Sequence, residues 1–173
     1  MKKYIILLRG INVSGKNKIP MVELRKLLND LEFKNIQTYI QSGNIILESR
    51  KSKSETCIII KEAILNVFGF DIGVIARTIP ELKNAVETYP FSILNPKIVA
   101  FVFLDKKSEI KDLQIPNSGE DQFKIVDDMV YIYCPSSFAD TKLSNSLFER
   151  KLNVRATTRN YNTTIKLLAL ATN

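Results

Sequence analysis

Two turn signals, each set between two strand-like segments, limit the folds open to this chain. The first is Ser42-Gly43 and the second is Asp127-Asp128. The strands expected on either side of these turns are 36–41, 44–48, 122–126 and 129–134. Because a tight turn joins antiparallel strands, each half of the chain should hold a sheet with an antiparallel pair.

The apolar residues around each hairpin predict the same order of further elements. Pro20 suits the first residue of a helix, and Ser52 and Glu55 have the spacing of a capping box. The further strands expected from apolar spacing are 4–8, 72–77, 98–104 and 154–158, and the expected helices are 20–31, 52–68, 78–88, 108–113, 140–152 and 161–168. Asp140 is the expected cap of the helix at 140–152.

This repeated order predicts an α+β protein. It indicates a tandem duplication of a ferredoxin-like βαββαβ unit, each copy with an extra C-terminal helix. The first unit with its helix is expected over 1–89, and the second with its helix over 98–173. The stretch 90–97 contains Pro90 and Pro96 and is expected to be the joint between them.

The composition excludes several kinds of chemistry. The sequence has no histidine, which rules out Ser-His-Asp and Cys-His catalysis as well as a zinc finger. Cys57 and Cys134 form no CxxC and are expected to be small buried apolar residues. No metal or cofactor is expected. Apolar runs such as 98–104 are too short to span a bilayer, and Arg9 interrupts the apolar start, so we expect a cytoplasmic protein without membrane association.

Charge is distributed unevenly along a chain with a formal net charge of +7. Residues 1–77 carry 13 basic and 7 acidic side chains, whereas 98–140 carry 4 and 8, and 141–173 carry 6 and 1. The two ends are therefore basic and the middle is acidic. Anionic partners are expected at the basic ends, although lysine-rich surfaces can also serve only solubility.

The strand order of the predicted unit gathers two polar segments at one edge of the first sheet. The end of the first strand and the hairpin that follows the second strand should meet there. Backbone N–H groups, cations and a helix start together favour an anion cradle, the alternative being that the glycines serve turns and the lysines are solvated. The ligand-binding residues predicted there are Arg9, Gly10, Asn12, Gly15, Lys16, Asn17, Lys18, Gln41, Ser42 and Asn44. The matching edge of the second unit carries Asp105, Asp127 and Asp128, so an anion should prefer the first.

A third polar segment, 155–163, lies where a strand is expected to meet the last helix. Thr158, Asn160 or Asn162 would suit the cap of that helix. Arg159 and Asn160 would also suit a phosphate or a carboxylate, so both are added to the predicted ligand-binding residues. Whether this segment joins the first-unit loops stays open.

Two further patterns allow more specific interpretations. The sequence of 10–17 reads G-x-x-x-x-G-K-N, one residue from a P-loop, but its last position lacks the hydroxyl that holds Mg²⁺ and a P-loop requires a parallel sheet. A P-loop NTPase is therefore disfavoured. Phe101 with Phe103, and Tyr131 with Tyr133, share a face of two central strands, where RNA-recognition domains stack bases. Packing in the core or between the halves is the favoured alternative.

Three segments, 7–17, 38–44 and 156–163, resemble the signature blocks of the DUF1697 family, a bacterial family of unknown function. The resemblance runs over essentially the whole chain. Ser14 and Tyr161 depart from the glycine and tryptophan that are usual at these positions. Membership would imply a cytoplasmic bacterial protein with a two-part ferredoxin-like structure, and it would imply no activity.

The favoured function is the binding of a phosphate-bearing ligand, nucleic acid or a nucleotide, at the basic edge of the first unit. One alternative is a small histidine-independent enzyme acting on a phosphorylated metabolite, with carboxylates, lysines or Tyr39 as acid and base. Another is a protein-interaction scaffold with an exposed apolar sheet face. The sequence assigns no catalytic residue and leaves the oligomeric state open.

Overall fold

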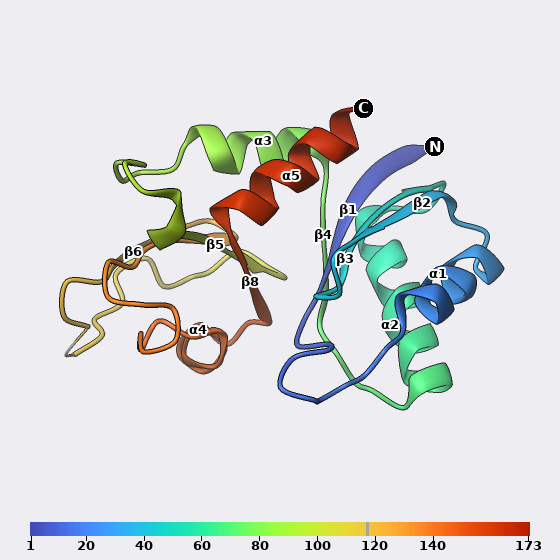
Figure 1. Cartoon of the computed structure of the whole chain (residues 1–173), viewed down its shortest axis with the longest axis horizontal. Coiled ribbons are helices and arrows are strands. Elements are labelled where there is room, and N and C mark those ends of the chain that lie inside the picture. The colour runs from blue at the N-terminus through green and yellow to red at the C-terminus, as the bar shows by residue number, and fades with distance from the viewer. Residues whose placement is uncertain (117) are drawn as a thin grey trace. The chain divides into compact units, whose positions relative to one another are not determined.

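Two four-stranded antiparallel sheets organise the chain in a computed structural model that describes residues 1–116 and 118–173 (Figure 1). The chain divides into two compact units. Unit 1 comprises Met1–Lys83 together with Leu167–Asn173, and unit 2 comprises Asn84–Lys166. The segment predicted as a joint, 90–97, lies within unit 2, and its role as a joint stays a prediction. Among the described residues, no helix is both long enough and apolar enough to cross a membrane.

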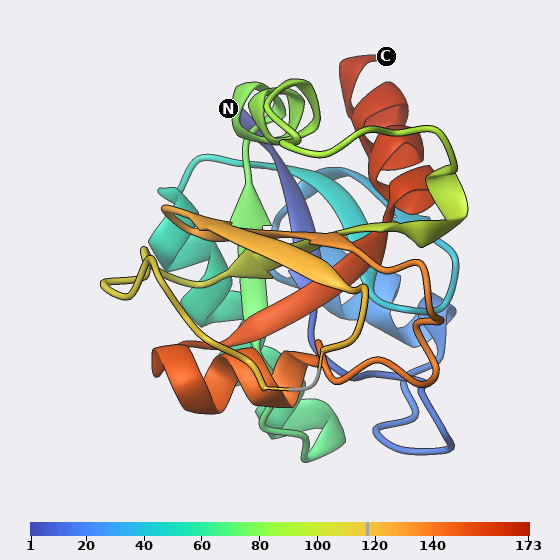
Figure 2. The ribbon, with the colours of Figure 1, turned by 90° about the vertical axis from the view of Figure 1, so that its left-hand side faces the viewer.

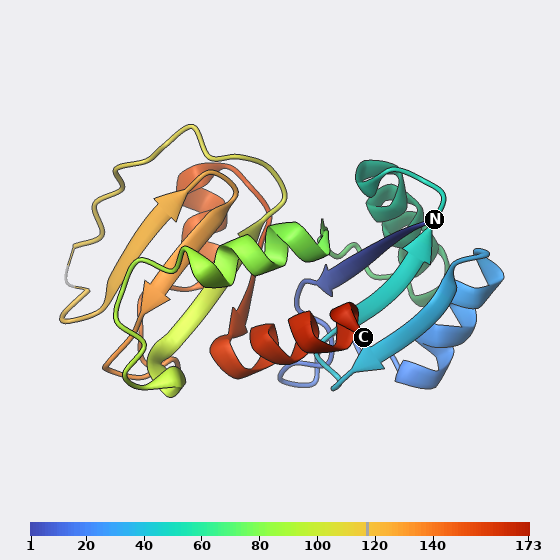
Figure 3. The same cartoon turned by 90° about the horizontal axis from the view of Figure 1, so that it is seen from above.

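The sheet of unit 1 has the strand order β2-β3-β1-β4, with every neighbouring pair antiparallel. Because β3 is antiparallel to both β1 and β2, these two strands run parallel, as expected of a βαββ arrangement. Figure 3 shows β1, β3 and β2 side by side. The elements of this unit are β1 (Lys2–Leu8), α1 (Met21–Asp30), β2 (Lys34–Tyr39), β3 (Asn44–Ser49), α2 (Lys53–Phe68), β4 (Val74–Arg77) and the start of α3 (Ile79–Glu87).

The core of unit 1 lies between its sheet and the helices α1 and α2. Alternate residues of β1 point toward these helices, as the period of two in a strand requires. The predicted capping box is confirmed, because the Ser52 side chain accepts from the Glu55 N–H and the Ser52 N–H donates to Glu55 Oε2 at 2.9 Å. Buried members of this core include Tyr4, Ile6, Leu8, Leu24, Leu28, Ile45, Leu47, Ile60 and Ile64.

Residues distant in sequence complete unit 1. The last turns of α5 (Tyr161–Thr172) belong to it, and the Lys3 ammonium donates to the Ala171 carbonyl at 2.9 Å. At the start of α3, Glu81 accepts from Lys53 Nζ at 2.5 Å and from the Thr78 N–H at 2.7 Å. Burial alone would raise the pKa of Glu81, but the bonds from Lys53 and Thr78 hold it below its ordinary value.

The sheet of unit 2 has the strand order β6-β7-β5-β8, and each strand holds the same position as in the first sheet. Its elements are the 3₁₀ turn η1 (Pro96–Ile98), β5 (Val99–Leu104), β6 (Gln122–Val126), β7 (Met129–Tyr133), α4 (Asn145–Leu152), β8 (Ala156–Asn160) and the start of α5. Figure 2 shows the β6–β7 hairpin, which turns at Asp127-Asp128 as predicted. The prediction of an α+β fold is confirmed, with two antiparallel sheets and five α-helices in the described residues.

The segment between β5 and β6 contradicts the prediction of a helix at 108–113. None of its described residues is helical. Ser108 Oγ accepts from the Ile110 N–H at 3.1 Å and donates to the Ile110 carbonyl at 2.7 Å, a local turn that competes with helix formation. Leu113 and Ile115 still pack on the core of unit 2 from this irregular chain, whereas Ile110 is exposed.

The cap predicted for α4 is also wrong. The helix begins after Ser144, whose side chain accepts from the Leu147 N–H at 3.2 Å, rather than at Asp140. The residues before it are tied elsewhere, because the Asp121 carboxylate accepts from the hydroxyl of Ser136 at 2.8 Å and from that of Thr141 at 2.7 Å. These bonds hold the chain that precedes α4 in a turn.

Several aromatic side chains of unit 2 pack on one another around Tyr89. The Tyr89 ring lies 5.5 Å from that of Phe101 and 5.8 Å from that of Tyr131, centroid to centroid. The Tyr89 hydroxyl donates to the Ile132 carbonyl at 2.8 Å. Phe101, Phe103 and Tyr131 are buried. Tyr133, the fourth ring of the predicted set, is half-buried. The burial of the other three favours the alternative of packing over base stacking.

The two thiols should react slowly in the folded protein. Cys134 is buried, and burial raises the pKa of the Cys57 thiol to about 11. At pH 8 this leaves roughly 100-fold less Cys57 thiolate than an unperturbed thiol would have. We expect slow labelling by a disulfide reagent in buffer and fast labelling of both thiols in urea. The variant Cys57→Ser identifies the signal of Cys134, and native labelling as fast as that of glutathione would contradict the prediction.

Candidate functional site

A loop and a hairpin meet at one end of the unit 1 sheet. We call them the loop edge, defined as residues 9–20 and 40–44. The Leu8 N–H donates to the Gly43 carbonyl at 2.8 Å, which brings the end of β1 against the β2–β3 hairpin. All residues of the predicted ligand-binding set except Arg159 and Asn160 lie on this edge.

Asn12 holds the loop edge together. Its Nδ2 donates to the carbonyls of Ile19 and Gln41, both at 2.9 Å, and its Oδ1 accepts from the Ile19 N–H at 2.8 Å. One side chain thus joins the two ends of the loop and ties them to the hairpin. Asn12 has φ +54°, a left-handed conformation that asparagine tolerates well. Its amide is a structural brace, with its two donors and its oxygen in use.

Two further asparagines of the predicted set also direct their amides into the loop edge. Asn17 Nδ2 donates to the Gly10 carbonyl at 3.0 Å. Asn44 is fully buried, and its Nδ2 donates to Ser42 Oγ at 2.9 Å and to the Tyr39 carbonyl at 3.2 Å. The Gln41 side chain, by contrast, is exposed. The amides that suggested ligand contacts therefore build the loop.

A tight turn carries the central part of the loop into solvent. The Lys16 N–H donates to the Val13 carbonyl at 3.0 Å, and the two residues between them, Ser14 and Gly15, have φ of +50° and +76°. Two successive positive φ values are those of a type I′ turn. A P-loop would instead point such N–H groups at a phosphate and would follow a parallel strand, so the rejection of that interpretation stands.

A shallow depression of about 530 Å³ opens on the loop edge. It is lined by Asn12, Gly15, Lys18 and Gln41 and by the start of α1. Pro20 provides no side-chain cap to α1, although Glu23 adds an acidic group to its first turn. Lys16 and Lys18 are exposed and have no ion-pair partner among the described residues. The depression therefore combines unpaired positive charge with the positive end of a helix.

Exposed apolar side chains lie at or near the loop edge, and one of them, Val22, lines the depression. Val13, Val22 and Ile40 keep 54%, 70% and 50% of their surface exposed. Ile40 also has φ +49°, a conformation that a β-branched residue rarely adopts. Strain of this kind occurs at functional sites more often than elsewhere. The loop edge is thus basic and partly apolar, and its hairpin is held in a strained form.

The remaining predicted residues have different surroundings. Arg9 is half-buried and Gly10 has φ +67°. Arg159 lies in unit 2 and is only 7% exposed; its Nη1 donates to Thr157 Oγ1 at 2.7 Å and to the Thr158 carbonyl at 2.9 Å. Burial lowers the pKa of this guanidinium to about 10. Asn160 caps α5, because its Oδ1 accepts from the Thr163 N–H at 2.8 Å.

The matching edge of unit 2 is acidic, as predicted. Asp127 Oδ1 lies 3.7 Å from Lys107 Nζ in an exposed pair, and Asp105 Oδ1 accepts from the Arg155 N–H at 2.9 Å. The Leu104 N–H donates to the Asp128 carbonyl, so this hairpin also meets the end of a central strand. This edge thus carries carboxylates that the loop edge of unit 1 lacks, together with the cations of Lys106 and Lys107.

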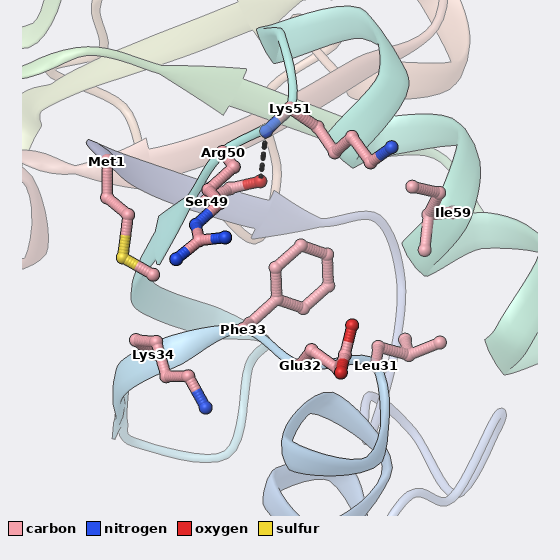
Figure 4. Close-up of a pocket in the computed structure, with 9 residues that line it drawn as sticks. All are labelled: Met1, Leu31, Glu32, Phe33, Lys34, Ser49, Arg50, Lys51 and Ile59. Carbon is pink, nitrogen blue, oxygen red and sulfur yellow. Dashed lines mark hydrogen bonds between the residues drawn. The ribbon is translucent and has the colours of Figure 1, made fainter.

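The sequence analysis did not identify a second pocket in unit 1, of about 250 Å³ (Figure 4). It lies at the other ends of β1, β2 and β3, and Arg50 and Lys51 are among its lining residues. The one signal in the sequence was the basic run at 50–51 directly after the expected strand at 44–48, and the register that places Lys34 beside Glu48 is visible only in the structure. Among the described residues, no group of three or more carboxylates and thiols could hold a metal ion.

These features define an α+β protein with two four-stranded antiparallel sheets and a basic loop edge on the first of them. The chain belongs to DUF1697, described as a protein family of unknown function, whose model matches residues 1–131. The resemblance noted from its signature segments is thereby confirmed.

A solved structure shows the same fold. The chain has 23% sequence identity and a TM-score of 0.71 to the conserved bacterial protein SP0830 from Streptococcus pneumoniae, with 98% of each chain covered. This similarity extends over both sheets. No curated protein matches the chain.

Replacing Asn12 by aspartate should open the loop edge. Asn12→Asp keeps the size and the acceptor oxygen but turns two donated bonds into contacts between an anion and carbonyl oxygens. We expect a loss of about 2–3 kcal/mol in unfolding free energy. Asn35→Asp is the matched control, since Asn35 also has a positive φ and is exposed. Urea unfolding measures both variants, and equal stability of the two would refute the brace.

Gly43 should tolerate no side chain. Its φ is +79°, and an added Cβ would lie 2.6 Å from Leu8 Cβ. Gly69→Ala is the control, because Gly69 has φ +76° with nothing within 4 Å of the added Cβ. We expect Gly69→Ala to cost about 1–2 kcal/mol from backbone strain and Gly43→Ala about 1–3 kcal/mol more from overpacking. Similar shifts of the urea midpoint in the two variants would count against the close approach.

Proposed function

We propose that the loop edge of unit 1 binds a phosphate-bearing ligand, nucleic acid or a nucleotide. The observation that carries the proposal is the depression of about 530 Å³, which Lys18 lines and beside which Lys16 is exposed, with neither lysine in an ion pair among the described residues. Lysine is a common phosphate ligand, and the start of α1 adds a favourable field. Both lysines are therefore available to an incoming anion.

The internal hydrogen bonds of the loop edge support this function. Asn12 and Asn17 fix the backbone that carries the lysines, and Asn44 fixes the hairpin beside it. A loop that is already ordered loses less conformational entropy when it binds. In this proposal the predicted asparagines act by holding the site, and Gln41 with the lysines contacts the ligand.

The lining of the depression favours binding over catalysis. No carboxylate lines it, and the sequence has no histidine. Tyr39, the other acid–base candidate, is half-buried on β2 and does not line it. An enzyme acting on a phosphorylated metabolite needs a group to move the proton, and Lys18 is the only ionisable side chain among the described residues that line the depression.

A second candidate function is a protein-interaction scaffold. The exposed side chains of Val13, Val22 and Ile40 favour it, because apolar residues gathered around one site are typical of interaction surfaces. Binding that is insensitive to salt and lost when Ile40 is replaced by a polar residue would indicate this function instead.

The duplication and the division of roles belong to the same proposal. We infer that two ferredoxin-like copies, 1–89 and 98–173, arose by duplication, and that the second copy lost its first helix. The shared strand order and the antiparallel pairing of both sheets support this origin. Unit 1 would bind the ligand and unit 2 would support it, in a bacterial cytoplasmic protein. A contribution of Arg159 and Asn160 to the site remains part of the prediction only.

The test measures binding of a fluorescently labelled oligothymidylate by anisotropy as salt is raised. We expect affinity to fall steeply between about 50 and about 200 mM NaCl. The double variant Lys16→Gln/Lys18→Gln should bind more weakly and reduce the slope of log K against log salt by about 1.4. Adenosine monophosphate as a competitor distinguishes a nucleotide site from a strand-binding surface.

The matched control is Lys106→Gln/Lys111→Gln, which removes the same charge from exposed lysines of unit 2. It should leave the slope close to that of the unchanged protein. Equal effects of the two double variants would show a response to net charge alone and would refute a site at the loop edge. Absence of binding by either probe at low salt would refute the proposed function itself.

A further inference from the structure

The second pocket of unit 1 has one apolar wall. Phe33, between α1 and β2, is only 4% exposed, and Leu31 and Ile59 are half-buried and pack on the same core. Figure 4 shows the Phe33 ring in the middle of the lining residues, with Ile59 to one side of it and Arg50 to the other. Leu31 and Ile59 are the members of this wall that keep exposed apolar surface, so an apolar group can pack on them.

The opposite side of the pocket is cationic. Lys34, Arg50 and Lys51 all line it and are all exposed, and none has an ion-pair partner among the described residues. The Lys51 N–H donates to Ser49 Oγ at 3.0 Å (Figure 4), and this bond fixes the turn that carries Arg50 and Lys51. Glu32 is the one acidic side chain in the lining. The pocket therefore holds a surplus of two positive charges.

The strand register, rather than the sequence, brings these groups together. Lys34 pairs with Glu48 at the start of β2, and Ser49 pairs with Lys2 at the start of β1. Charged residues from the end of α1, the start of β2 and the end of β3 thus lie around the apolar wall. At about 250 Å³ the pocket is a little smaller than those of about 300–1,000 Å³ that hold drug-sized ligands.

We propose that this pocket binds a small molecule with an apolar body of about one ring and a single oxyanion group, a carboxylate or a phosphate. The body lies on Leu31 and Ile59, and the buried Phe33 supports them from the core. The oxyanion is held by Arg50, whose planar guanidinium matches two oxygens of either group, and Lys34 and Lys51 add positive charge. The site is separate from the loop edge, which lies at the other ends of the same strands.

Glu32 allows a second, independent test of the proposal. Its carboxylate lines the same pocket and repels a bound anion. Removing this charge should strengthen binding, whereas removing that of Arg50 should weaken it. A purely apolar pocket predicts no change with either variant, and a pocket for cations predicts the opposite signs.

The experiment is an amide chemical-shift titration of the nitrogen-15-labelled protein with 3-phenylpropionate and with phenyl phosphate. We expect saturable shifts at residues 31–34 and 49–51, with a dissociation constant at or below about 1 mM. The neutral analogue 3-phenylpropanamide and the bare anion acetate should each bind at least about tenfold more weakly. The tighter of the two anionic probes identifies which oxyanion the pocket prefers.

Three variants complete the test. Arg50→Gln should weaken binding of the better probe by about tenfold or more, and Glu32→Gln should strengthen it severalfold. Arg150→Gln, an exposed arginine of α4, removes the same charge from unit 2 and should change nothing. Equal binding by Arg50→Gln and the unchanged protein would overturn the proposal. So would shifts centred on 12–22, which would place the probe at the loop edge, or binding of the amide as tight as that of the anion.

Discussion

The hydrogen bonding of β3 between β1 and β2 determines how the rest of unit 1 is arranged. Because β3 runs opposite to both neighbours, Asn44 pairs with Leu7 at one end and Ser49 with Lys2 at the other. Every loop of the unit is thereby assigned to one end of the sheet or the other. The loop edge lies at one end of the sheet and the second pocket of unit 1, the cationic pocket, lies at the other. Each is built from residues that are far apart in the sequence.

The asparagines of the loop edge illustrate how a functional pattern can arise from a structural need. Glycine and asparagine accept left-handed backbone, and asparagine amides satisfy the carbonyls of a loop. Asn12 does both, with φ +54° and three hydrogen bonds. A sequence rich in these residues indicates a sharply folded loop before it indicates a ligand. The lysines that this loop holds in solvent are the groups with capacity left for a ligand.

The sequence predicted the features that depend on local chemistry. The capping box at Ser52 and the turn at Asp127-Asp128 are governed by residues within a few positions of one another and form as expected. The first hairpin also forms, but β2 ends at Tyr39 and the turn spans 40–43 instead of Ser42-Gly43 alone. The helix at 108–113 failed for an equally local reason, the turn made by the Ser108 hydroxyl. The cationic pocket could not be predicted in this way, because Lys34 and Arg50 meet only through the pairing of β2 with β3. Spacing along the sequence does not show that two residues on different strands are neighbours until the register of the strand pairing is known.

The bond between Lys3 and the Ala171 carbonyl has a consequence for the order in which the protein can form. Unit 1 is discontinuous in sequence, and its last residues are synthesised only after the whole of unit 2. On the ribosome, the strands of the first sheet, which all lie within 2–77, can pair early, but unit 1 lacks the last turns of α5 until the contiguous residues of unit 2 have been synthesised. The half of the molecule that is made first is thus the half that is completed last.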